Sequence, residues 1–284
     1  MALTRKFNEP INTQIPQVTN NSNDIVFDER QHKYYKNGIE LQSVTTFLDA
    51  QLFPKFTEGN KHIFISNNVI KANTRKGYGI TNAIDLRRDW HCKGNSTSCD
   101  GTSAHEFATR LFIHNKYGQR TVDEFIKTEV KTGYHKAVLG FWEEFNKEWK
   151  IIESEKRLAS LEYNLAGTLD ILAEHRTEKG RYAIGDYKAK ESLDKTYNIC
   201  KNELSKFKDS GENKAIAQMT IYSIMGKYNV KPEDIFIVKL NYNGTHEIRG
   251  GKYTKLPDMR KEIKKALVNR SKNNPNKKYI LSLI

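Results

Sequence analysis

The chain of 284 residues carries 47 Lys and Arg against 34 Asp and Glu, a formal net charge of +13, and 37% of its residues are hydrophobic. This length can bury a substantial core in one large or two small domains, and the composition excludes a fully disordered chain. No apolar run approaches the roughly 18–20 residues that cross a bilayer, and the N-terminal residues lack the apolar core of a secretory signal, so we expect a soluble intracellular protein with no membrane partner.

The excess of positive charge favours an anionic partner, although a solvated lysine-rich surface would have the same composition. The three cysteines, Cys92, Cys99 and Cys200, are an odd number for a disulfide framework. The spacing of Cys92 and Cys99 fits neither a zinc knuckle nor an iron–sulfur cluster. We therefore expect free thiols in a reducing compartment.

The N-terminal part predicts an arm, a hairpin and a short helix. Residues 1–23 are rich in Asn, Gln, Thr and Pro without periodicity and predict a flexible arm. Residues 24–41 predict a hairpin, because β-rich runs flank Asn37-Gly38, the strongest short turn signal in the chain. Ser43 then predicts the N-cap of the helix that follows.

The stretch between residues 57 and 100 is less regular. We expect helices over 61–73 and near 80–92, and a small polar loop over 93–101.

Residues 101–118 predict an amphipathic helix. Ser103 and Glu106 have the spacing of a capping box, which would start the helix here. His105 would then lie in the first turn, where the helix dipole disfavours imidazolium and keeps the side chain neutral and able to bind a metal. A lone histidine in such a place is more often a core or capping residue, so both roles stay open. The buried side of the helix would consist of Phe107, Ala108, Leu111 and Phe112.

Three charged side chains interrupt the otherwise apolar, β-rich residues 158–190: Asp170, Asp186 and Lys188. The polar segment 175–180 ends in Gly and predicts a hairpin turn. Equal steps back from its centre place Asp170 opposite Asp186. Side chains alternate along a strand, so Asp186 and Lys188 share one face.

Two opposed carboxylates repel each other unless a cation or a proton lies between them. Oxygen ligands favour Mg²⁺ or Mn²⁺, and Lys188 would stand one step further along, beside any anion at the metal. This combination indicates metal-assisted hydrolysis of a phosphodiester. An Asp–Lys pair on a half-exposed strand would give the same short pattern, but Asp170 in an apolar hairpin favours a site.

Further along the chain, residues 134–150 carry aromatic and apolar side chains at helical spacing and predict a packing stripe. Residues 191–213 predict a polar loop with a short helix. Residues 214–228 predict an amphipathic helix on which Gln218 and Tyr222 share one face. Both side chains can hydrogen-bond to phosphate or base edges, or can form only the polar rim of a packed helix.

The C-terminal part begins with a buried strand over 234–240 and a second strand over 245–248 beside it. A basic helix over about 256–272 follows. From Gly251 onward there are ten Lys or Arg and two acidic residues, so this part holds over half of the net charge. Such a helix can contact phosphates or simply solubilise the protein.

Taken in order, the motifs are Gly101-Thr102-x-x-His105, Glu162, Gly167-Thr168-x-Asp170, Asp186-Tyr187-Lys188 and Gln218-x-x-x-Tyr222. This order resembles the PD-(D/E)XK nuclease superfamily, and most of all its RecB-like branch, which adds the upstream histidine and the Q-x-x-x-Y helix. Ser43-Val44-Thr45-Thr46 also resembles the entry segment of mitochondrial genome maintenance exonucleases and their phage relatives.

The resemblance covers roughly residues 24–245. It implies an α/β fold with a restriction-endonuclease-like core, in which a central mixed β-sheet is flanked by helices, with an extra N-terminal hairpin and helices. Residues 24–284 would then form a single nuclease domain with its catalytic core at about 101–245.

The resemblance assigns the metal, Mg²⁺ or Mn²⁺, to His105, Asp170, Asp186 and the carbonyl of Tyr187. Lys188 would orient the attacking water or stabilise the developing charge. The second acid is Asp186 rather than the glutamate that is commoner in this superfamily.

By the same resemblance, Glu162 matches an acidic catalytic position that helps to hold metal or water, and Gln218 and Tyr222 would support the substrate or the catalytic lysine. The four cysteines of the iron–sulfur members are absent, so no iron–sulfur cluster is expected. The chain also lacks a GxxxxGK[ST] phosphate loop, so no nucleotide cofactor is expected.

The activity implied is that of an exonuclease on single-stranded DNA or DNA ends, in recombination, repair or phage DNA metabolism. A structure-specific endonuclease, a catalytically inactive nucleic-acid-binding module and a Mg²⁺-dependent hydrolase of another phosphate ester are the alternatives. The full set of charged residues argues against the inactive module, and the basic C-terminal region favours a polymeric substrate.

Overall fold

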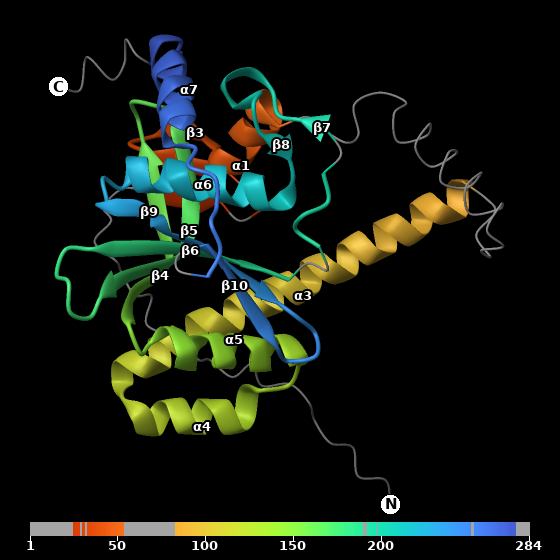
Figure 1. Ribbon diagram of the computed structural model, residues 1–284, viewed down its shortest axis with the longest axis vertical. Coiled ribbons are helices and arrows are strands. Elements are labelled where there is room, and N and C mark those ends of the chain that lie inside the picture. Colours follow the sequence, from red (N-terminus) through yellow and green to blue (C-terminus); the bar gives the residue numbers. More distant parts are fainter. Residues whose placement is uncertain are drawn as a thin grey trace, which may run out of the picture.

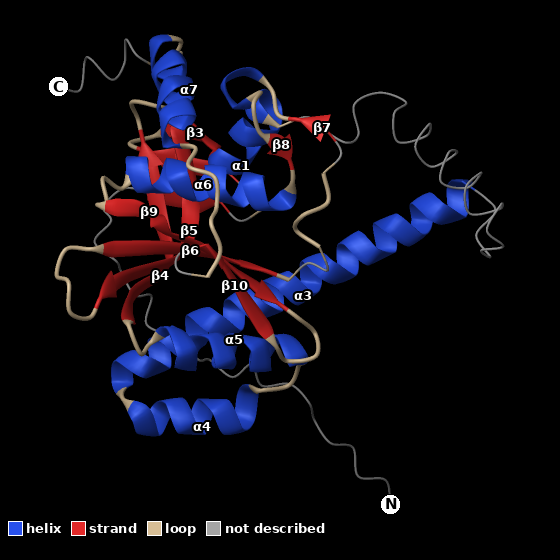
Figure 2. Ribbon diagram, in the orientation of Figure 1, coloured by secondary structure: helices blue, strands red, loops and turns tan. Residues whose placement is uncertain are grey.

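The computed structural model describes residues 25–28, 30–31, 33–53, 83–189, 192–196, 198–250 and 253–276, with backbone alone for 83–95 and 97. The arm predicted at 1–23 and the helix predicted at 61–73 lie outside the described residues. The described part has an α/β fold with a central mixed sheet between two groups of helices (Figure 1, Figure 2). This agrees with the α/β class and the helix-flanked mixed sheet expected from the sequence, while the restriction-endonuclease-like core and the domain limits at 24–284 stay predictions.

The described strands of the main sheet are β1 (Ile25–Asp28), β2 (Lys33–Lys36), β3 (Ile39–Ser43), β4 (Trp149–Ser160), β5 (Leu165–His175), β6 (Tyr182–Lys188), β9 (Val230–Leu240) and β10 (His246–Gly250). Their order is β1-β2-β3-β5-β6-β9-β10, and β4 pairs with β5 off this path. The β3–β5 and β6–β9 pairs are parallel and the other pairs antiparallel. A small separate pair joins β7 (Asn198–Ile199) and β8 (Lys208–Asp209).

The described helices are α1 (Val44–Phe47), the π-helix η1 (Leu48–Leu52), α3 (Ala83–Tyr117), α4 (Gln119–Glu129), α5 (Gly133–Phe145), the 3₁₀ helix η2 (Asn202–Leu204), α6 (Gly211–Met225) and α7 (Arg260–Lys272). No helix within the described ranges combines the length and the apolar character needed to span a membrane.

Two apolar cores lie on the two faces of the sheet. Residues of α1, η1, α6 and α7 pack on one face, where Phe47, Ile184 and Ile221 are fully buried. Residues of α3, α4 and α5 pack on the other, around Leu111 and Phe141. Figure 1 shows α6 and α7 on one side of the sheet and α3, α4 and α5 on the other. A residue at the centre of the sheet can therefore be reached from helices on both faces.

The N-terminal hairpin and its helix cap agree with the sequence prediction. Asn37 and Gly38 have φ angles of 52° and 75°, and a tight two-residue hairpin turn requires this left-handed backbone at both positions. The Oγ of Ser43 accepts a hydrogen bond from the backbone N–H of Thr46 at 3.0 Å, which caps α1.

The start of the helix that carries His105 was predicted wrongly. Residues 93–101 are not a loop, since α3 runs without a break from Ala83 to Tyr117. Ser103 does not cap it, because its Oγ lies 3.0 Å from Nε2 of His135. Thr102 bonds through its Oγ1 to the carbonyl of Ser98, so its hydroxyl is satisfied within the helix and does not interrupt it. The buried side was predicted correctly.

The packing stripe predicted at 134–150 divides between two elements. Helix α5 ends at Phe145, and Trp149 is the first residue of β4. The Trp149 ring still stacks with Phe145, with centroids 6.1 Å apart, and packs edge-on against His175. Burial of the stripe was therefore predicted correctly, but its helical continuation past Phe145 was wrong.

Candidate functional site

The site lies where the sheet divides along one edge of β5. Strand β3 pairs with Leu165 and Ala166 at the start of β5, while β6 pairs with residues 171–174 further along. Residues 167–170 lie between these two pairings. Such divergence of neighbouring strands leaves room beside the sheet, as at the ligand-binding crevices of open α/β sheets. Asp170 stands at the end of this gap, yet it is only 8% exposed.

Asp170 and Asp186 are neighbours on adjacent strands, as the turn prediction required. The last described pair of the β5–β6 ladder is Ile171 with Gly185, and one further step in the same register brings Asp170 level with Asp186. The backbone N–H of Tyr187 donates a hydrogen bond of 2.9 Å to Oδ2 of Asp170. A buried backbone group thus fixes the Asp170 carboxylate against β6.

Lys188 and Asp186 form an ion pair in which Nζ lies 2.5 Å from Oδ2. The contact does not have hydrogen-bond geometry, and no group in the described part of the chain donates a hydrogen bond to this buried oxygen. Burial lowers the pKa of Lys188, but the charges of Asp186 and Asp170 outweigh it and raise the pKa above its ordinary value. Lys188 therefore stays a cation.

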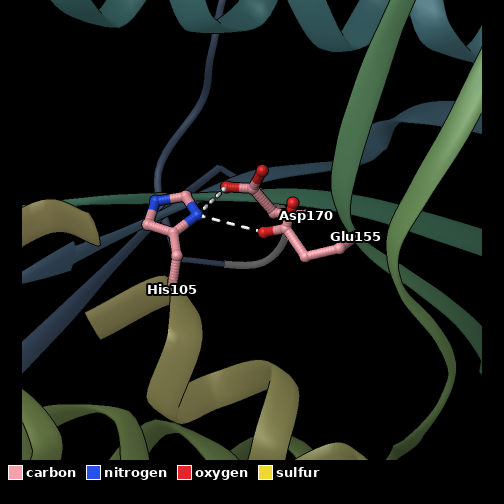
Figure 3. A group of neighbouring side chains, drawn as sticks. All are labelled: His105, Glu155 and Asp170. Atoms are coloured by element: carbon pink, nitrogen blue, oxygen red, sulfur yellow. Dashed lines mark hydrogen bonds and ion pairs between the residues drawn. The ribbon is translucent and has the colours of Figure 1, made fainter. Parts of the chain in front are cut away.

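His105 lies on α3 and approaches the Asp170 carboxylate from the face of the sheet opposite to α6. Its Nδ1 lies 3.3 Å from Oε1 of Glu155 and 3.4 Å from Oδ2 of Asp170, as Figure 3 shows. Its Nε2–H faces the carbonyl oxygen of Tyr187 at 3.2 Å. The carbonyl predicted as a metal ligand is thus held beside the histidine predicted as another ligand.

The expectation that His105 stays neutral was wrong. The residue lies in the middle of α3, far from the positive end of the helix dipole. Burial lowers its pKa, but the carboxylates of Asp170, Glu155 and Asp186 outweigh burial and raise the pKa to about 9. In the metal-free protein at neutral pH, a proton on His105 supplies the cationic charge that these carboxylates need.

Glu155 is the member of the site that the sequence did not reveal. It lies on β4 between two described pairs, Ser154 with Ile171 and Lys156 with Leu169, which place it level with Asp170. Its φ of 51° is left-handed, a strained backbone for a residue with a side chain. Such outliers within strands re-aim a side chain and are over-represented beside active sites. Had the turn between β4 and β5 been recognised, the register would have paired Glu155 with Asp170.

The carboxylates of Glu155 and Asp170 meet at His105, and Asp186 on the next strand lies outside this group but near enough for its charge to act on Asp170 and His105. Burial and the charges of Asp186 and Glu155 raise the pKa of Asp170 to about 7, against the lowering effect of His105 and Lys188. Ligand atoms of His105, Glu155 and Asp170 all lie within 4.8 Å of one another. One imidazole nitrogen with several hard carboxylate oxygens suits Mg²⁺ or Mn²⁺, so the residues present fit a divalent cation.

Glu162 is not part of this cluster. It is exposed in the turn at residues 161–164, where its carbonyl accepts a hydrogen bond from Asn274. The segment from this turn to Asp170 spans about 20 Å at about 3.3 Å per residue. Its predicted role in holding metal or water is incompatible with this position, and Glu155 supplies an acidic side chain at the site instead.

Gln218 and Tyr222 lie on α6, beside the gap in the sheet. Nε2 of Gln218 donates a hydrogen bond of 3.1 Å to the hydroxyl of Tyr222, which is only 3% exposed. A Cβ at Gly167 would lie 2.3 Å from the hydroxyl oxygen of Tyr222, so this position of β5 admits the ring because it is glycine. Burial raises the pKa of Tyr222, so the phenol stays neutral. The pair buttresses β5, and Tyr222 is too buried to serve as an open substrate contact.

Neither protein-family models nor curated proteins match this chain.

Proposed function

We propose that this protein is a metal-dependent nuclease that hydrolyses phosphodiester bonds of DNA, acting as an exonuclease on single strands or DNA ends. The observation that carries the proposal is the ion pair of the Lys188 cation with the buried Asp186 carboxylate, next to the group of His105, Glu155 and Asp170. A histidine with carboxylates occurs in many metal sites. A lysine at the same carboxylate adds a cation for an anionic substrate.

The residues divide the work by charge and position. Asp170, Asp186 and Glu155, with His105, would hold a divalent cation, which when bound polarises a phosphate and lowers the pKa of an attacking water. Lys188 is placed to stabilise the negative charge that develops on the phosphate oxygens or to orient the water. In the metal-free protein the charges of Asp186 and Asp170 raise its pKa and so favour the cation needed for that purpose.

A polymeric anion is the substrate class that the charge distribution favours. The net charge of +13 supports attraction of a polyanion over a single small phosphate ester. The resemblance of the motif order to RecB-like nucleases supports DNA and digestion from ends.

The test is degradation of end-labelled single-stranded, duplex and covalently closed circular DNA with Mg²⁺ or Mn²⁺. Wild-type protein is compared with Lys188→Ala and with Lys179→Ala, a matched lysine that is 82% exposed in the β5–β6 turn. We expect loss of linear DNA, survival of circles, full activity of Lys179→Ala and none for Lys188→Ala. EDTA should stop the reaction.

Cleavage of covalently closed circular DNA would mean that the protein is an endonuclease with the same chemistry rather than an exonuclease. A wild-type protein that cuts no DNA with either metal, or a Lys188→Ala variant as active as wild type, would overturn the proposal.

A further inference from the structure

A second polar site lies at one end of the β4–β5 hairpin, under α7. It is a cavity of about 430 Å³ between α7, the turn at residues 161–164 and the η1–η2 region. Five asparagines and a lysine contribute to its wall: Asn164, Asn202, Asn269, Asn273, Asn274 and Lys265. We call it the amide cavity. Figure 1 shows α7 at this end of the molecule, beyond α6.

The cavity wall is held firmly by hydrogen bonds that use amide nitrogens. Nδ2 of Asn202 donates to the carbonyl of Gln51 at 2.6 Å, and Nδ2 of Asn269 to Glu203 at 2.7 Å. Asn164 and Asn202 both have φ of 50°, a left-handed backbone that asparagine tolerates better than most residues. The shape of the cavity is therefore built into the fold.

The floor of the cavity is fixed by Arg270. Its Nε donates to the carbonyl of Tyr163 at 2.5 Å and its Nη2 to that of Asn164 at 2.9 Å. The guanidinium also lies over the ring of Phe47, 4.9 Å from its centroid. Arg270 is thus committed to the protein, which leaves ligand recognition to other side chains.

Those side chains offer acceptors and one available cation. The side-chain oxygens of Asn202, Asn269 and Asn273 accept no hydrogen bond from the residues that the structure covers. Lys265 is exposed and has no ion-pair partner within those residues. The free amide oxygens can accept hydrogen bonds from the N–H groups on the edge of a nucleobase, and a lysine matches a phosphate.

The amide cavity and the Tyr222 side of the site lie on the same face of the sheet, since Ala266 and Leu267 of α7 share a core with Tyr222. The segment between them spans about 20 Å. Tyr222 of α6 packs on Gly167 within this segment, so a nucleic acid strand would have to pass outside α6. At about 3.4 Å per stacked nucleotide, at least about six nucleotides would connect the two points.

We propose that the amide cavity binds one nucleotide of a single-stranded nucleic acid whose phosphodiester at the Asp170 site lies at least about six nucleotides away. The base enters among the asparagines and a neighbouring phosphate contacts Lys265. A single strand is required, because only an unstacked base can be splayed into a cavity. The inference rests on the proposed function for the position of the strand, but not for binding itself.

The test measures binding without cleavage, by fluorescence anisotropy of labelled single-stranded oligonucleotides in EDTA. Lys265→Ala and Asn273→Ala are compared with Lys264→Ala, an exposed lysine next to Lys265 that does not line the cavity. For an oligonucleotide of about 12 nucleotides, we expect Lys265→Ala to raise Kd about fivefold and to lower the salt dependence by about one phosphate contact. Asn273→Ala should raise Kd with an unchanged salt slope, and Lys264→Ala should resemble wild type.

An oligonucleotide of about four nucleotides cannot reach both points but can still enter the cavity, so Lys265→Ala and Asn273→Ala should weaken its binding as well. Equal weakening by Lys264→Ala and Lys265→Ala would show a diffuse basic surface and overturn the inference, as would absence of any binding. Normal cavity-dependent binding without cleavage in Mg²⁺ would overturn the proposed nuclease and leave the amide cavity standing.

Discussion

Two regions of this protein bury carboxylates in opposite ways. At the far end of β6, Asp234 is 4% exposed and receives two hydrogen bonds from the Arg181 guanidinium, at 2.9 and 2.7 Å. The pair is bidentate, and the guanidinium charge balances the carboxylate charge. The hydrogen bond with Asp234 raises the pKa of Arg181. A buried charge that is paired in this way holds a fold together without further partners.

The candidate metal centre is incomplete by comparison. Asp170, Asp186 and Glu155 face one lysine and one histidine, and an oxygen of Asp186 lacks a donor among the described residues. Here the fold holds like charges together against their repulsion. The comparison teaches that a buried carboxylate alone does not indicate a functional site. Uncompensated repulsion between neighbouring buried carboxylates is the more informative sign.

The largest difference should appear when each buried aspartate is replaced by its isostere. Asp170→Asn should lower the cleavage rate about 10³-fold, since it removes a ligand and a charge at the reacting phosphate. Its stability should be unchanged or higher, because repulsion from Asp186 and Glu155 is relieved. The matched Asp234→Asn should lose stability and keep the activity of its folded fraction. Cleavage assays and urea unfolding of both variants provide the measurement. Equal losses of activity in Asp170→Asn and Asp234→Asn would contradict the distinction between a catalytic and a structural aspartate.

The next largest effect should be on the stability that the Arg181–Asp234 ion pair provides. Arg181→Ala leaves Asp234 buried without its partner and should lower the free energy of unfolding by about 3 kcal/mol. Arg120→Ala, which breaks a surface pair with Glu124, should cost less than about 0.5 kcal/mol. Urea denaturation with an unchanged slope measures both. A loss at Arg181 as small as that at Arg120 would mean that solvent reaches Asp234.

A smaller effect should follow pH in the metal-free protein. The pKa of His105 is about 9 in the folded state, above its ordinary value of 6.5. Its contribution to stability is therefore complete below about pH 6.5 and is lost as pH rises through 9, on the order of 2 kcal/mol. A Mg²⁺ ion bound as proposed would take over the role of the proton, so the effect of Mg²⁺ on Tm should be larger at pH 9 than at pH 6.

Thermal unfolding of wild type and His105→Gln, with and without Mg²⁺, checks this prediction. The variant cannot carry the proton, so its Mg²⁺ shift in Tm should depend less on pH. Identical pH profiles for the two proteins would remove His105 from the charge balance of the site.

The smallest expected effect concerns the backbone of Glu155. Glu155→Gly relieves the left-handed strain and should stabilise the metal-free protein by about 1 kcal/mol, while weakening Mg²⁺ binding. Glu153→Gly, two residues earlier on the same strand without that backbone, should instead destabilise by about 0.5–1 kcal/mol. Calorimetry of unfolding and of Mg²⁺ binding separates the two. A destabilised Glu155→Gly would show that no strain is stored there.

The parts of the site that follow local rules could be predicted from the sequence. The polar turn before Gly180 fixed the register of one hairpin and so brought Asp170 beside Asp186. Alternation placed Lys188 on the Asp186 side, and their ion pair agrees with that prediction. Gln218 and Tyr222 share one face of α6, as their spacing predicted, and are hydrogen-bonded to each other.

The parts that depend on irregular backbone or on tertiary contacts could not. Glu155 has a left-handed φ where it joins the site, and a glutamate in the sequence does not indicate such a backbone. Glu162 satisfied the order of motifs but lies in an exposed turn. The helix around Ser103 continues past an apparent cap because His135 takes the serine hydroxyl.

Helix α7 also bears on how the protein is made. Arg270 and Asn274 bind the carbonyls of residues 161–164, the turn that joins the strands of Glu155 and Asp170. Ribosomes deliver a chain from its N-terminus, so α7 emerges after every other described element. The turn between β4 and β5 therefore lacks its hydrogen bonds to Arg270 and Asn274 until α7 has left the ribosome. We expect a nascent chain to reach metal-binding competence only at that late stage of its synthesis.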